Sequence, residues 1–336
     1  MIVRNPVNSF CNRVFYCLLI SFLTIAVVRQ GFASQIVPFA THNQNPLISI
    51  YGLPVPTSAD LLPLNESALQ LTSNFSNTIN NESTTSEILF IDIETHNLNL
   101  IYDIAFRKNM MLRLHIPFIK HYEGFMDKWI DDYHDMLNLP DGIRPAFPRD
   151  QVAIYYELNG TALINMQQPE SGLGDISLQM AFQAVAENNF SLSYWAGIKL
   201  PTGDHKKLTG SGHMDFNFWI ASSKQLNDSL SIYTNAGMIL IQDSYILKPV
   251  QKDRVAFLTT GLQYQATEKI QLKAQLDNHS AFYKSATRFL GSVTQLTFGG
   301  SILFKHDSEL DIAVAEDVKT NASPDVNFNL TWRLRF

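Results

Sequence analysis

The residues best suited to metal chemistry lie in a stretch rich in acidic side chains. Asp131, His134 and Asp135 are three or four positions apart, so a helix would place them on one face, and His121 and Glu123 lie shortly before them. Carboxylate oxygens in this arrangement suit a hard cation. A solvated acidic helix face explains the same residues without a ligand. We therefore predict no metal site and no cofactor.

A second acidic group lies among glycines, in the stretch from Asp204 to Asp215. Its carboxylates could bind calcium, but the glycines here, like Gly172 and Gly174, are first of all turn residues. The sequence around them does not follow the order of strand, glycine loop and helix that a nucleotide site requires. The stretch therefore predicts tight turns.

Catalysis would need a nucleophile or an acid beside a histidine. His279 directly precedes Ser280, and Asp204 directly precedes His205. Neighbouring residues of a strand point to opposite faces, so neither pair is aligned by its own backbone. The sequence also lacks a nucleophile-elbow motif. We expect a protein that is not an enzyme. The weakest hypothesis for its function is a lipid-modifying enzyme, whose site would lie at the rim of a β-barrel.

Residues 1–33 have the features of a secretory signal peptide. Arg4 and Arg13 precede an apolar run over residues 14–28, and Gly31 and Ala33 are the small residues expected before a cleavage site. The run is only a few residues short of a membrane span, so an uncleaved anchor is the alternative.

Cleavage after residue 33 would change the character of the chain. It would remove both cysteines and three Arg, so the formal net charge would change from −6 to −9. This acidity argues against nucleic acid as a partner. The chain is 46% hydrophobic and only 17% charged, whereas roughly a quarter of the residues of soluble domains are charged.

Apolar and polar residues alternate along nearly the whole of the remaining chain. The alternating segments are about ten residues long and are separated by turn residues, which is typical of a transmembrane β-barrel. Short connections, among them the Asn-Gly pair at 159–160, also alternate with long ones. We therefore predict an all-β protein, a transmembrane antiparallel barrel over residues 66–336 with 12–14 strands, 14 being favoured. The clearest segments are 110–118, 176–183, 192–200, 270–277, 296–304, 310–314 and 326–336.

A soluble β-sandwich is the competing fold, since its strands alternate as well. The polar positions here are mostly Gln, Asn, Ser and Thr rather than dense charge. A water-facing lumen needs such residues, while the apolar positions face lipid. The pattern therefore favours a barrel in the outer membrane of a Gram-negative bacterium, surrounded by lipid and lipopolysaccharide.

The parity of the alternation assigns eight polar residues to the lumen. They could select a solute, or they could simply fill and brace a narrow interior. The two arginines of the last segment should pair with acids in the lumen or with the N-terminal segment. The eight residues are Arg113, His115, Gln179, Gln183, Lys273, Gln275, Arg333 and Arg335.

The longest loop contains a helical pattern. Phe125, Trp129, Ile130 and Tyr133 recur at helical spacing with acidic residues on the opposite side, which predicts one amphipathic helix of about four turns in an extracellular loop. Its apolar face could lie across the barrel mouth as a gate, rest at the membrane surface, or pack against neighbouring loops.

The last segment, residues 326–336, combines an apolar stripe with a terminal Phe. A soluble edge strand of this kind would be an aggregation liability. A C-terminal strand that ends in Phe resembles the assembly signal of bacterial outer-membrane proteins, which the barrel-insertion machinery recognises. The residues of this stripe that would form the signal are Phe328, Leu330, Trp332, Leu334 and Phe336.

Several stretches resemble a proteobacterial family of outer-membrane proteins known as a domain of unknown function. They are "NPLISIYGLPVP" (45–56), "PFIKHYEGFMDKWIDDYHDMLNLPDGIRP" (117–145), "SGLGDISL" (171–178) and "GIKLPTGDHKKLTGSGHMD" (197–215). The last two are also similar to the phenol-degradation meta-pathway outer-membrane family, whose members are presumed relatives of channels for hydrophobic compounds. In such channels an N-terminal segment plugs the barrel. The resemblance therefore implies that residues 34–65, which have little strand pattern, form a plug.

Together these patterns predict a barrel without covalent chemistry. The first hypothesis for its function is passage of a small solute, which could be apolar, through the lumen as a channel or passive transporter. The second is a structural or surface-interaction barrel whose lumen is blocked, and the third is the rim enzyme. The sequence does not name the solute.

Overall fold

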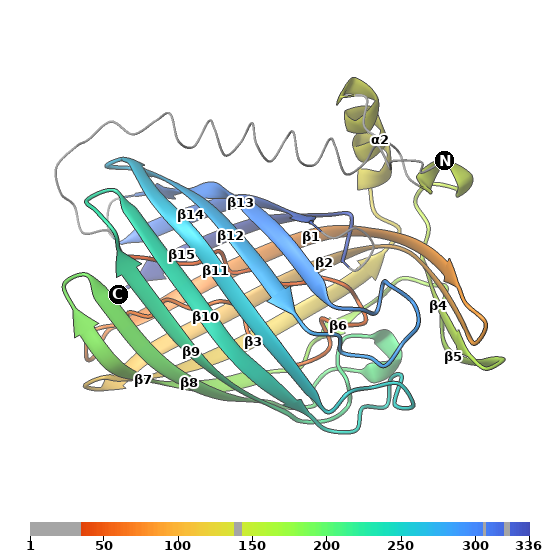
Figure 1. Cartoon of the computed structure of the whole chain (residues 1–336), viewed down its shortest axis with the longest axis horizontal. Coiled ribbons are helices and arrows are strands. Elements are labelled where there is room, and N and C mark those ends of the chain that lie inside the picture. Colours follow the sequence, from red (N-terminus) through yellow and green to blue (C-terminus); the bar gives the residue numbers. More distant parts are fainter. Residues whose placement is uncertain (1–34, 138–142, 305–306, 319–322) are drawn as a thin grey trace, which may run out of the picture.

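Twelve antiparallel strands close into a barrel in the computed structural model, which describes residues 35–137, 143–304, 307–318 and 323–336 (Figure 1). The predicted signal peptide, residues 1–33, lies outside the described residues. The transmembrane-type barrel predicted from the alternation is confirmed. Among the described residues, no helix is both long and apolar enough to cross a membrane.

Each strand of the ring pairs with the ring strands that precede and follow it in the sequence, and the last strand pairs with the first. The order around the ring is β1 (Ser67–Ser83), β2 (Glu87–Arg107), β3 (Met110–Tyr122), β7 (Ser177–Glu187), β8 (Phe190–Lys199), β9 (Asp215–Gln225), β10 (Leu230–Ile241), β11 (Arg254–Thr267), β12 (Ile270–His279), β13 (Val293–Leu303), β14 (Ser308–Asp317) and β15 (Val326–Arg335).

The ring closes between its first and last strands. β1 pairs with β15 from Ala68 opposite Arg335 to Asn77 opposite Val326. At the short-turn end, Phe336 N–H donates to Ser67 O at 2.9 Å and Ser67 N–H donates to Phe336 O at 2.8 Å. Closure leaves the ring without the unpaired edges that make open sheets prone to association.

Three further strands extend from the ring at the end of the long loops. β6 (Glu170–Leu173) pairs with the end of β3, and β4 (Ala153–Leu158) pairs with residues 87–92 of β2. β5 (Thr161–Met166) returns along β4 through a turn in which Asn159 and Gly160 both have positive φ.

The hairpin of β4 and β5 explains the strand count. The sequence placed the turn at residues 159–160 among the short turns of the barrel, but the structure places it at the opposite end (Figure 1). β2 has 21 residues, about twice what one membrane crossing needs. Its first part therefore stands beyond the ring and pairs with β4, and the ring itself has the smaller number of strands in the predicted range.

The two faces of the wall differ as the alternation requires. Leu71, Phe118 and Leu330 are exposed on the outside, and their chain neighbours Thr72, Ile119 and Thr331 are buried inside. Besides the strands there are one α-helix, α2 (Met126–Leu137), and two short 3-10 helices, η1 (Arg144–Ala146) and η2 (His205–Lys207), within the described residues. All three follow strands at the long-loop end.

Candidate functional site

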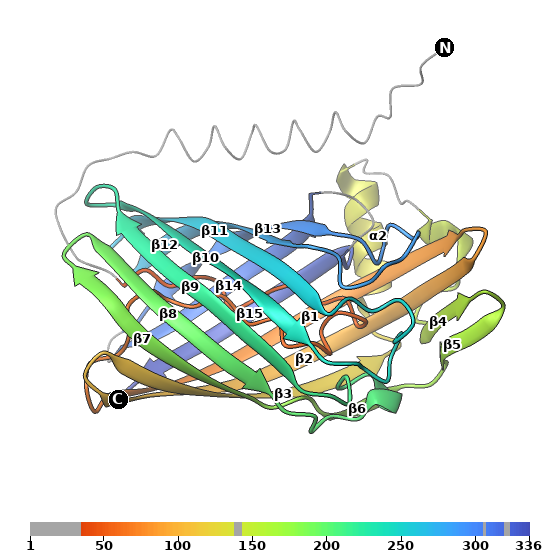
Figure 2. The same ribbon diagram turned by 60° about the horizontal axis from the view of Figure 1, so that its bottom comes forward.

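Residues 35–62, which we call the luminal segment, lie inside the barrel as two limbs joined by a turn (Figure 2). The first limb contacts side chains of β11, β12 and β15, and the second contacts side chains of β7, β9 and β10. The limbs meet near the short-turn end, where Ser58 Oγ donates to Ile36 O at 2.9 Å. One limb therefore runs along the lumen toward the long-loop end, and the other returns toward the short-turn end.

Amide side chains of the wall hold the backbone of the luminal segment. Gln275 Oε1 accepts from Phe39 N–H at 3.0 Å, and its Nε2 donates to Phe39 O at 3.4 Å. Asn235 does the same for Thr57, at 3.0 Å in both directions. An amide side chain carries a donor and an acceptor side by side. One wall residue can therefore satisfy both backbone groups of a residue that is not part of any strand.

Gln183 and Gln263 repeat this arrangement at the short-turn end. Gln183 Oε1 accepts from Leu61 N–H at 2.8 Å and its Nε2 donates to Ala59 O at 2.9 Å. Gln263 Oε1 accepts from Val37 N–H at 3.1 Å. Buried backbone groups must find partners, and the lumen wall supplies them here.

A buried ionic cluster holds the turn of the luminal segment. Lys199 Nζ pairs with Asp175, lies 3.2 Å from Asp215 Oδ2, and donates to Ile50 O at 3.2 Å. Asp215 Oδ2 in turn accepts from Gly52 N–H at 2.8 Å. The three charged side chains are nearly inaccessible to solvent. The cluster thus connects two strands of the wall directly to the backbone of the luminal segment.

The loop residues around Lys199 complete this cluster. Asp175 Oδ1 accepts from Gly203 N–H at 2.8 Å, and its Oδ2 accepts from Ser211 N–H at 3.0 Å. A Cβ at Gly210 would clash with Asp175 Oδ1, so a side chain there would push the carboxylate out of place. The glycines of this stretch therefore allow the loop to close around one carboxylate.

Stretches far apart in the sequence meet at this cluster. Gly52 belongs to residues 45–56, Asp175 to residues 171–178, and Lys199 and Asp215 to residues 197–215. Residues 117–145 reach the same place, because Gly174 N–H donates to Pro117 O at 2.8 Å and His121 Nε2 lies 3.2 Å from Leu208 O. The motif residues thus form one connected site around the luminal segment.

A second ionic cluster lies beside the first limb. Lys273 Nζ is 3.1 Å from Glu309 Oε1 and 3.2 Å from Asp311 Oδ1. Arg333 Nη1 is 2.6 Å from Asp311 Oδ2, and its Nη2 donates to Pro38 O at 3.2 Å. Lys273 Nζ also lies 5.2 Å from the centre of the Phe39 ring. The charged side chains of this cluster are therefore paired with one another, and Lys273 and Arg333 also contact the luminal segment.

The turn of the luminal segment is sealed into an apolar core at the long-loop end. Leu47, Ile48 and Tyr51 are buried with residues of the loops 242–253 and 280–292. The Tyr51 ring stacks on Phe282 with 5.2 Å between centres. Loops and luminal segment therefore close this end of the barrel together.

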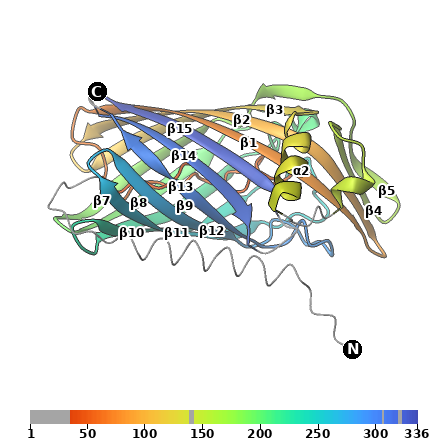
Figure 3. The same ribbon diagram turned by 90° about the horizontal axis from the view of Figure 1, so that it is seen from above.

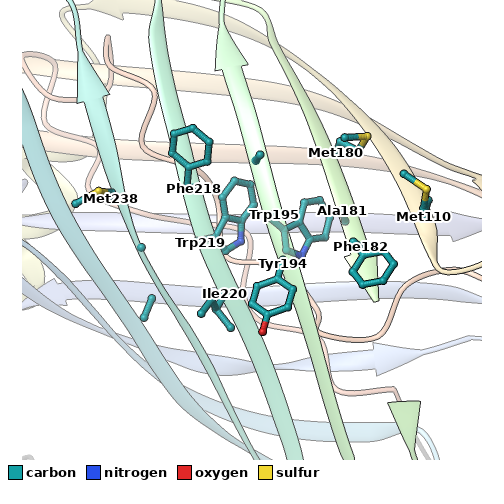
Figure 4. Close-up of a pocket in the computed structure, with 13 residues that line it drawn as sticks. Met110, Met180, Ala181, Phe182, Tyr194, Trp195, Phe218, Trp219, Ile220 and Met238 are labelled. Carbon is teal, nitrogen blue, oxygen red and sulfur yellow. The ribbon is translucent and has the colours of Figure 1, made fainter. Parts of the chain in front are cut away.

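Two small cavities lie beside the luminal segment. A cavity of about 60 Å³ lies between it and residues such as Arg113 and Arg333, and one of about 30 Å³ lies beside Tyr51 and Lys199. These volumes suit only a few water molecules. A larger depression of about 600 Å³ lies in the wall, and exposed side chains such as Phe218 and Met238 border it (Figure 4).

The comparisons with known proteins give a family and a fold. A family described as "Protein of unknown function (DUF3187)" matches residues 14–336. The chain belongs to this family. It matches no curated protein. The family agrees with the resemblance to a domain of unknown function, and the similarity to the phenol-degradation family stays a prediction.

Solved structures similar to this DUF3187 chain are membrane barrels. An outer-membrane channel from Pseudomonas putida F1 is 14% identical, with a TM-score of 0.57 over 84% of this chain and 99% of that one. The KdgM porin is 8% identical, with a TM-score of 0.43 over 80% and 99%. The toluene transporter TodX of P. putida is 9% identical, with a TM-score of 0.39 over 82% and 91%. The first shares the fold, and the scores of the other two are too low to support an argument.

The eight predicted lumen residues of this DUF3187 chain have side chains in the interior or at its rim. Gln183, Gln275, Lys273 and Arg333 contact the luminal segment as described above. Arg113 pairs with Asp103 at 2.7 Å, His115 Nε2 lies 2.7 Å from Asn99 Oδ1, Gln179 is buried, and Arg335 borders the cavity near the short-turn end. Four of the eight therefore belong to the site, and the other four line the wall.

The predicted gate residues lie elsewhere. Phe125 and Trp129 contact outward-facing side chains of β1 and β15, and Ile130 is buried. Tyr133 lies on α2, but its side chain is outside the described part of the structure. In this structure α2 therefore stands beside the barrel mouth and does not cross it.

The residues predicted as an assembly signal form an outward stripe on β15. Leu330, Trp332 and Phe336 are exposed on the outer face of the wall. Trp332 Nε1 donates to Ser308 Oγ at 2.8 Å. Recognition of this stripe by the insertion machinery stays a prediction.

The residues considered for catalysis and metal binding have structural partners. His279 Nε2 lies 3.0 Å from Asn43 Nδ2 in the interior, whereas Ser280 Oγ accepts from Ala256 N–H at 3.0 Å. Asp204 caps η2. Within the described residues, no group of three or more His, Cys, Asp or Glu side chains could hold a metal ion.

Sequence reasoning missed the residues that bind the luminal segment most directly. Lys199, Asn217 and Asn235 were not singled out, and Asp215 was considered only as a possible calcium ligand. Lys199 precedes the outward Leu200, so parity alone would place it inside. The alternation could therefore have assigned Lys199 to the interior. It could not show what Lys199 binds there, because a backbone that is bound by wall side chains leaves no pattern in its own sequence.

Proposed function

We propose that this protein is an outer-membrane channel for a small solute and that the luminal segment is its plug. The observation that carries the proposal is how the segment is held. Wall side chains bind its backbone, and it pairs with no strand of the ring. Such a segment can leave without breaking the sheet. The P. putida F1 protein with the same fold is called an outer-membrane channel, which supports the class of function.

The solute remains the open part of the proposal. The wall offers mostly Gln, Asn, Ser and Thr to the lumen, and the turn of the plug is apolar. A small apolar solute would replace the contacts that the turn makes with the loops. Uptake into vesicles of one apolar and one polar solute of equal size would separate the two classes.

A structural barrel with a permanently blocked lumen is the second candidate. It is favoured by the small cavities of about 60 and 30 Å³ and by the complete pairing of Lys199. Conductance in planar bilayers distinguishes the two. We expect the full chain to be closed most of the time, and a variant without residues 35–62 to conduct steadily.

A reversible cross-link avoids the risk that this deletion fails to fold. A Cβ built at Gly52 lies 3.4 Å from Lys199 Cβ, close to the range of roughly 3.5–4.5 Å found in disulfides. In a chain with Cys11 and Cys17 changed to Ser, we expect Gly52→Cys/Lys199→Cys to be closed when oxidised and to open on reduction. Lys199→Cys alone is the control and should not respond to reductant. A barrel that stays closed in the deletion and in the reduced variant would favour the structural candidate.

We also infer that the barrel resides in the outer membrane, among lipid and lipopolysaccharide, and that insertion begins with the C-terminal strand. The outward stripe ending at Phe336 supports this. Deleting Phe336 should lower the fraction of protein that migrates as a folded, heat-modifiable barrel in cells. The same deletion should have little effect on folding into detergent, where no insertion machinery is present.

A further inference from the structure

α2 lies on the outer side of the barrel wall. Its axis crosses the long axis of the barrel, beside the end of β1 (Figures 1 and 3). A helix in this orientation lies roughly parallel to the plane of a membrane that the barrel spans. Its neighbours are outward-facing side chains, which places it outside the lumen.

Buried polar contacts fix the first turn of α2 and the segment after it. Met126 N–H donates to Glu94 Oε1, and Arg144 Nη1 lies 3.0 Å from Asp127 Oδ1. Asp127 also accepts from Asn77 Nδ2 at 2.8 Å. Asn77 and Glu94 are opposite each other on β1 and β2, on the face that turns outward. The helix is therefore attached to the wall itself.

Two aromatic side chains of this region remain exposed. Phe125, just before α2, is 64% exposed and Trp129 is 54% exposed, whereas Met126 and Ile130 are buried. The Phe125 ring is 6.4 Å from Phe75, and the Trp129 ring is 5.3 Å from Phe328. Both rings therefore extend an apolar surface that begins on the barrel.

The position of these contacts along the barrel is informative. Phe75 and Phe328 are opposite each other near the long-loop end of the β1–β15 pairing, and Trp332 and Phe336 lie toward the other end. Aromatic residues gather at the two interfaces of a barrel's apolar band. Phe125 and Trp129 thus lie at the height of the outer interface.

The remaining side of α2 is polar. Lys128 pairs with Asp132 at 2.6 Å, and both are well exposed. Asp131 pairs with Arg149 on a second segment at the same end. One side of the helix faces the wall, one faces water, and the aromatic side continues the lipid-facing stripe.

We propose that α2 is an interfacial helix and that Phe125 and Trp129 insert into the outer leaflet of the membrane beside the barrel. The occupant of this surface is lipid at the boundary of head groups and acyl chains, because the surface is continuous with the face that already contacts lipid. Burying the apolar face of an amphipathic helix at this depth stabilises its attachment. The proposal does not depend on whether the lumen conducts.

Tryptophan fluorescence tests the proposal in the full chain folded into vesicles of phosphatidylcholine with or without brominated acyl chains. The chain has four Trp. Trp195 and Trp219 are buried, while Trp129 and Trp332 are exposed. Trp332→Phe leaves Trp129 as the exposed fluorophore, Trp129→Phe leaves the lipid-facing Trp332 as positive control, and the double variant gives the interior background.

After subtraction of the background, we expect brominated lipid to quench most of the Trp129 emission, as it quenches Trp332. Bromine close to the head group should quench Trp129 more strongly than bromine deep in the chain. Strong quenching by aqueous iodide together with insensitivity to brominated lipid would place Trp129 in water and overturn the proposal. Insensitivity to both quenchers, with emission that changes with the protein-to-lipid ratio, would mean that a second copy covers the surface, and would overturn it as well.

Discussion

Two segments without strand structure are attached to this barrel, one inside the wall and one outside, and they are held in different ways. The luminal segment is bound through its backbone by Gln275, Asn235 and Asp215 of the wall. The outer helix is bound chiefly through side chains, among them Asp127 and Arg144. Backbone binding is indifferent to the side chains of the bound segment, whereas side-chain binding requires particular partners. Along its two limbs the inner attachment should therefore depend on the wall, while its turn also depends on the packing of Leu47, Ile48 and Tyr51. The outer attachment should depend on both partners.

The largest expected effect comes from Lys199→Met. It leaves Asp175 and Asp215 buried without their cation, and breaking a buried pair in this way costs about 3–5 kcal/mol. If the cost falls on the plugged state, the ratio of open to closed channels should rise by roughly two to three orders of magnitude, since ~1.4 kcal/mol is tenfold. Open probability in planar bilayers measures this. Adding Asp215→Asn to Lys199→Met should lower the open probability again in part. An unchanged open probability in Lys199→Met would mean that the ionic cluster does not hold the plug in place.

Asn235→Leu comes next and tests binding through the backbone. It removes the partner of both backbone groups of Thr57, and an unsatisfied buried polar group costs about 1–3 kcal/mol. We expect a higher open probability than in the full chain, but lower than in Lys199→Met. Thr57→Ser on the plug is the matched control and should have the smaller effect, because it keeps the hydroxyl that bonds Asn235 Oδ1 and Trp219 Nε1. Equal effects of the two variants would contradict the contrast between wall and plug.

Arg144→Met tests the outer attachment. It removes the partner of Asp127 and of Asp325, and Asp325 is already 39% exposed, so we expect a loss of about 1–2 kcal/mol. Hydrogen exchange in α2 should accelerate while conductance stays the same. Lys128→Met removes only a solvated pair, worth roughly 0.3–0.5 kcal/mol, and is the control. A change in conductance in Arg144→Met would instead show that the outer helix and the luminal segment are energetically coupled.

The pH dependence of the outer attachment should be opposite in sign to that of a carboxylate in a salt bridge. Asp92 lies in the part of β2 that extends past the β1–β15 pairing, and burial, followed by the nearby charge of Asp127, raises its pKa from 3.8 to about 7. The folded state therefore keeps a proton that the unfolded state releases. Stability falls as pH rises from about 4, and the loss is complete above about 7.

The protection factors of the α2 amides, which are exchange rates corrected for the intrinsic rate at each pH, should accordingly be higher at acidic pH than at pH values above this range. Asp92→Asn should remove the difference, because an amide carries no charge at any pH. Arg144, Asp150 and Asp325 also influence this carboxyl. If the difference persisted in Asp92→Asn, one of the other acidic groups would be responsible.

The sequence predicted the wall far better than the two segments attached to it. Lipid on one side and a polar interior on the other impose a period of two, so Leu330 and Thr331 could be assigned to opposite faces from the alternation alone. The path of the luminal segment left no such trace, since residues such as Val37 and Phe39 are bound by their backbone. Amphipathicity predicted α2, but an apolar stripe does not specify whether a lumen, a loop or a membrane covers it. The hairpin through Asn159 was read as part of the ring because strands in and beyond the ring alternate alike.

The connection between the luminal segment and β1 limits how the lumen could open. Leu62 is joined to Ser67 by residues 63–66 alone, a connection that spans roughly 17 Å when extended. The end of the second limb, beside Gln183, therefore stays near the short-turn end in any state that keeps β1 in the ring. The first limb lies along β11, β12 and β15, with Gln275 and Arg333 beneath it. Opening would then be asymmetric. A solute would pass on the side of β11, β12 and β15 instead of through the centre of the barrel.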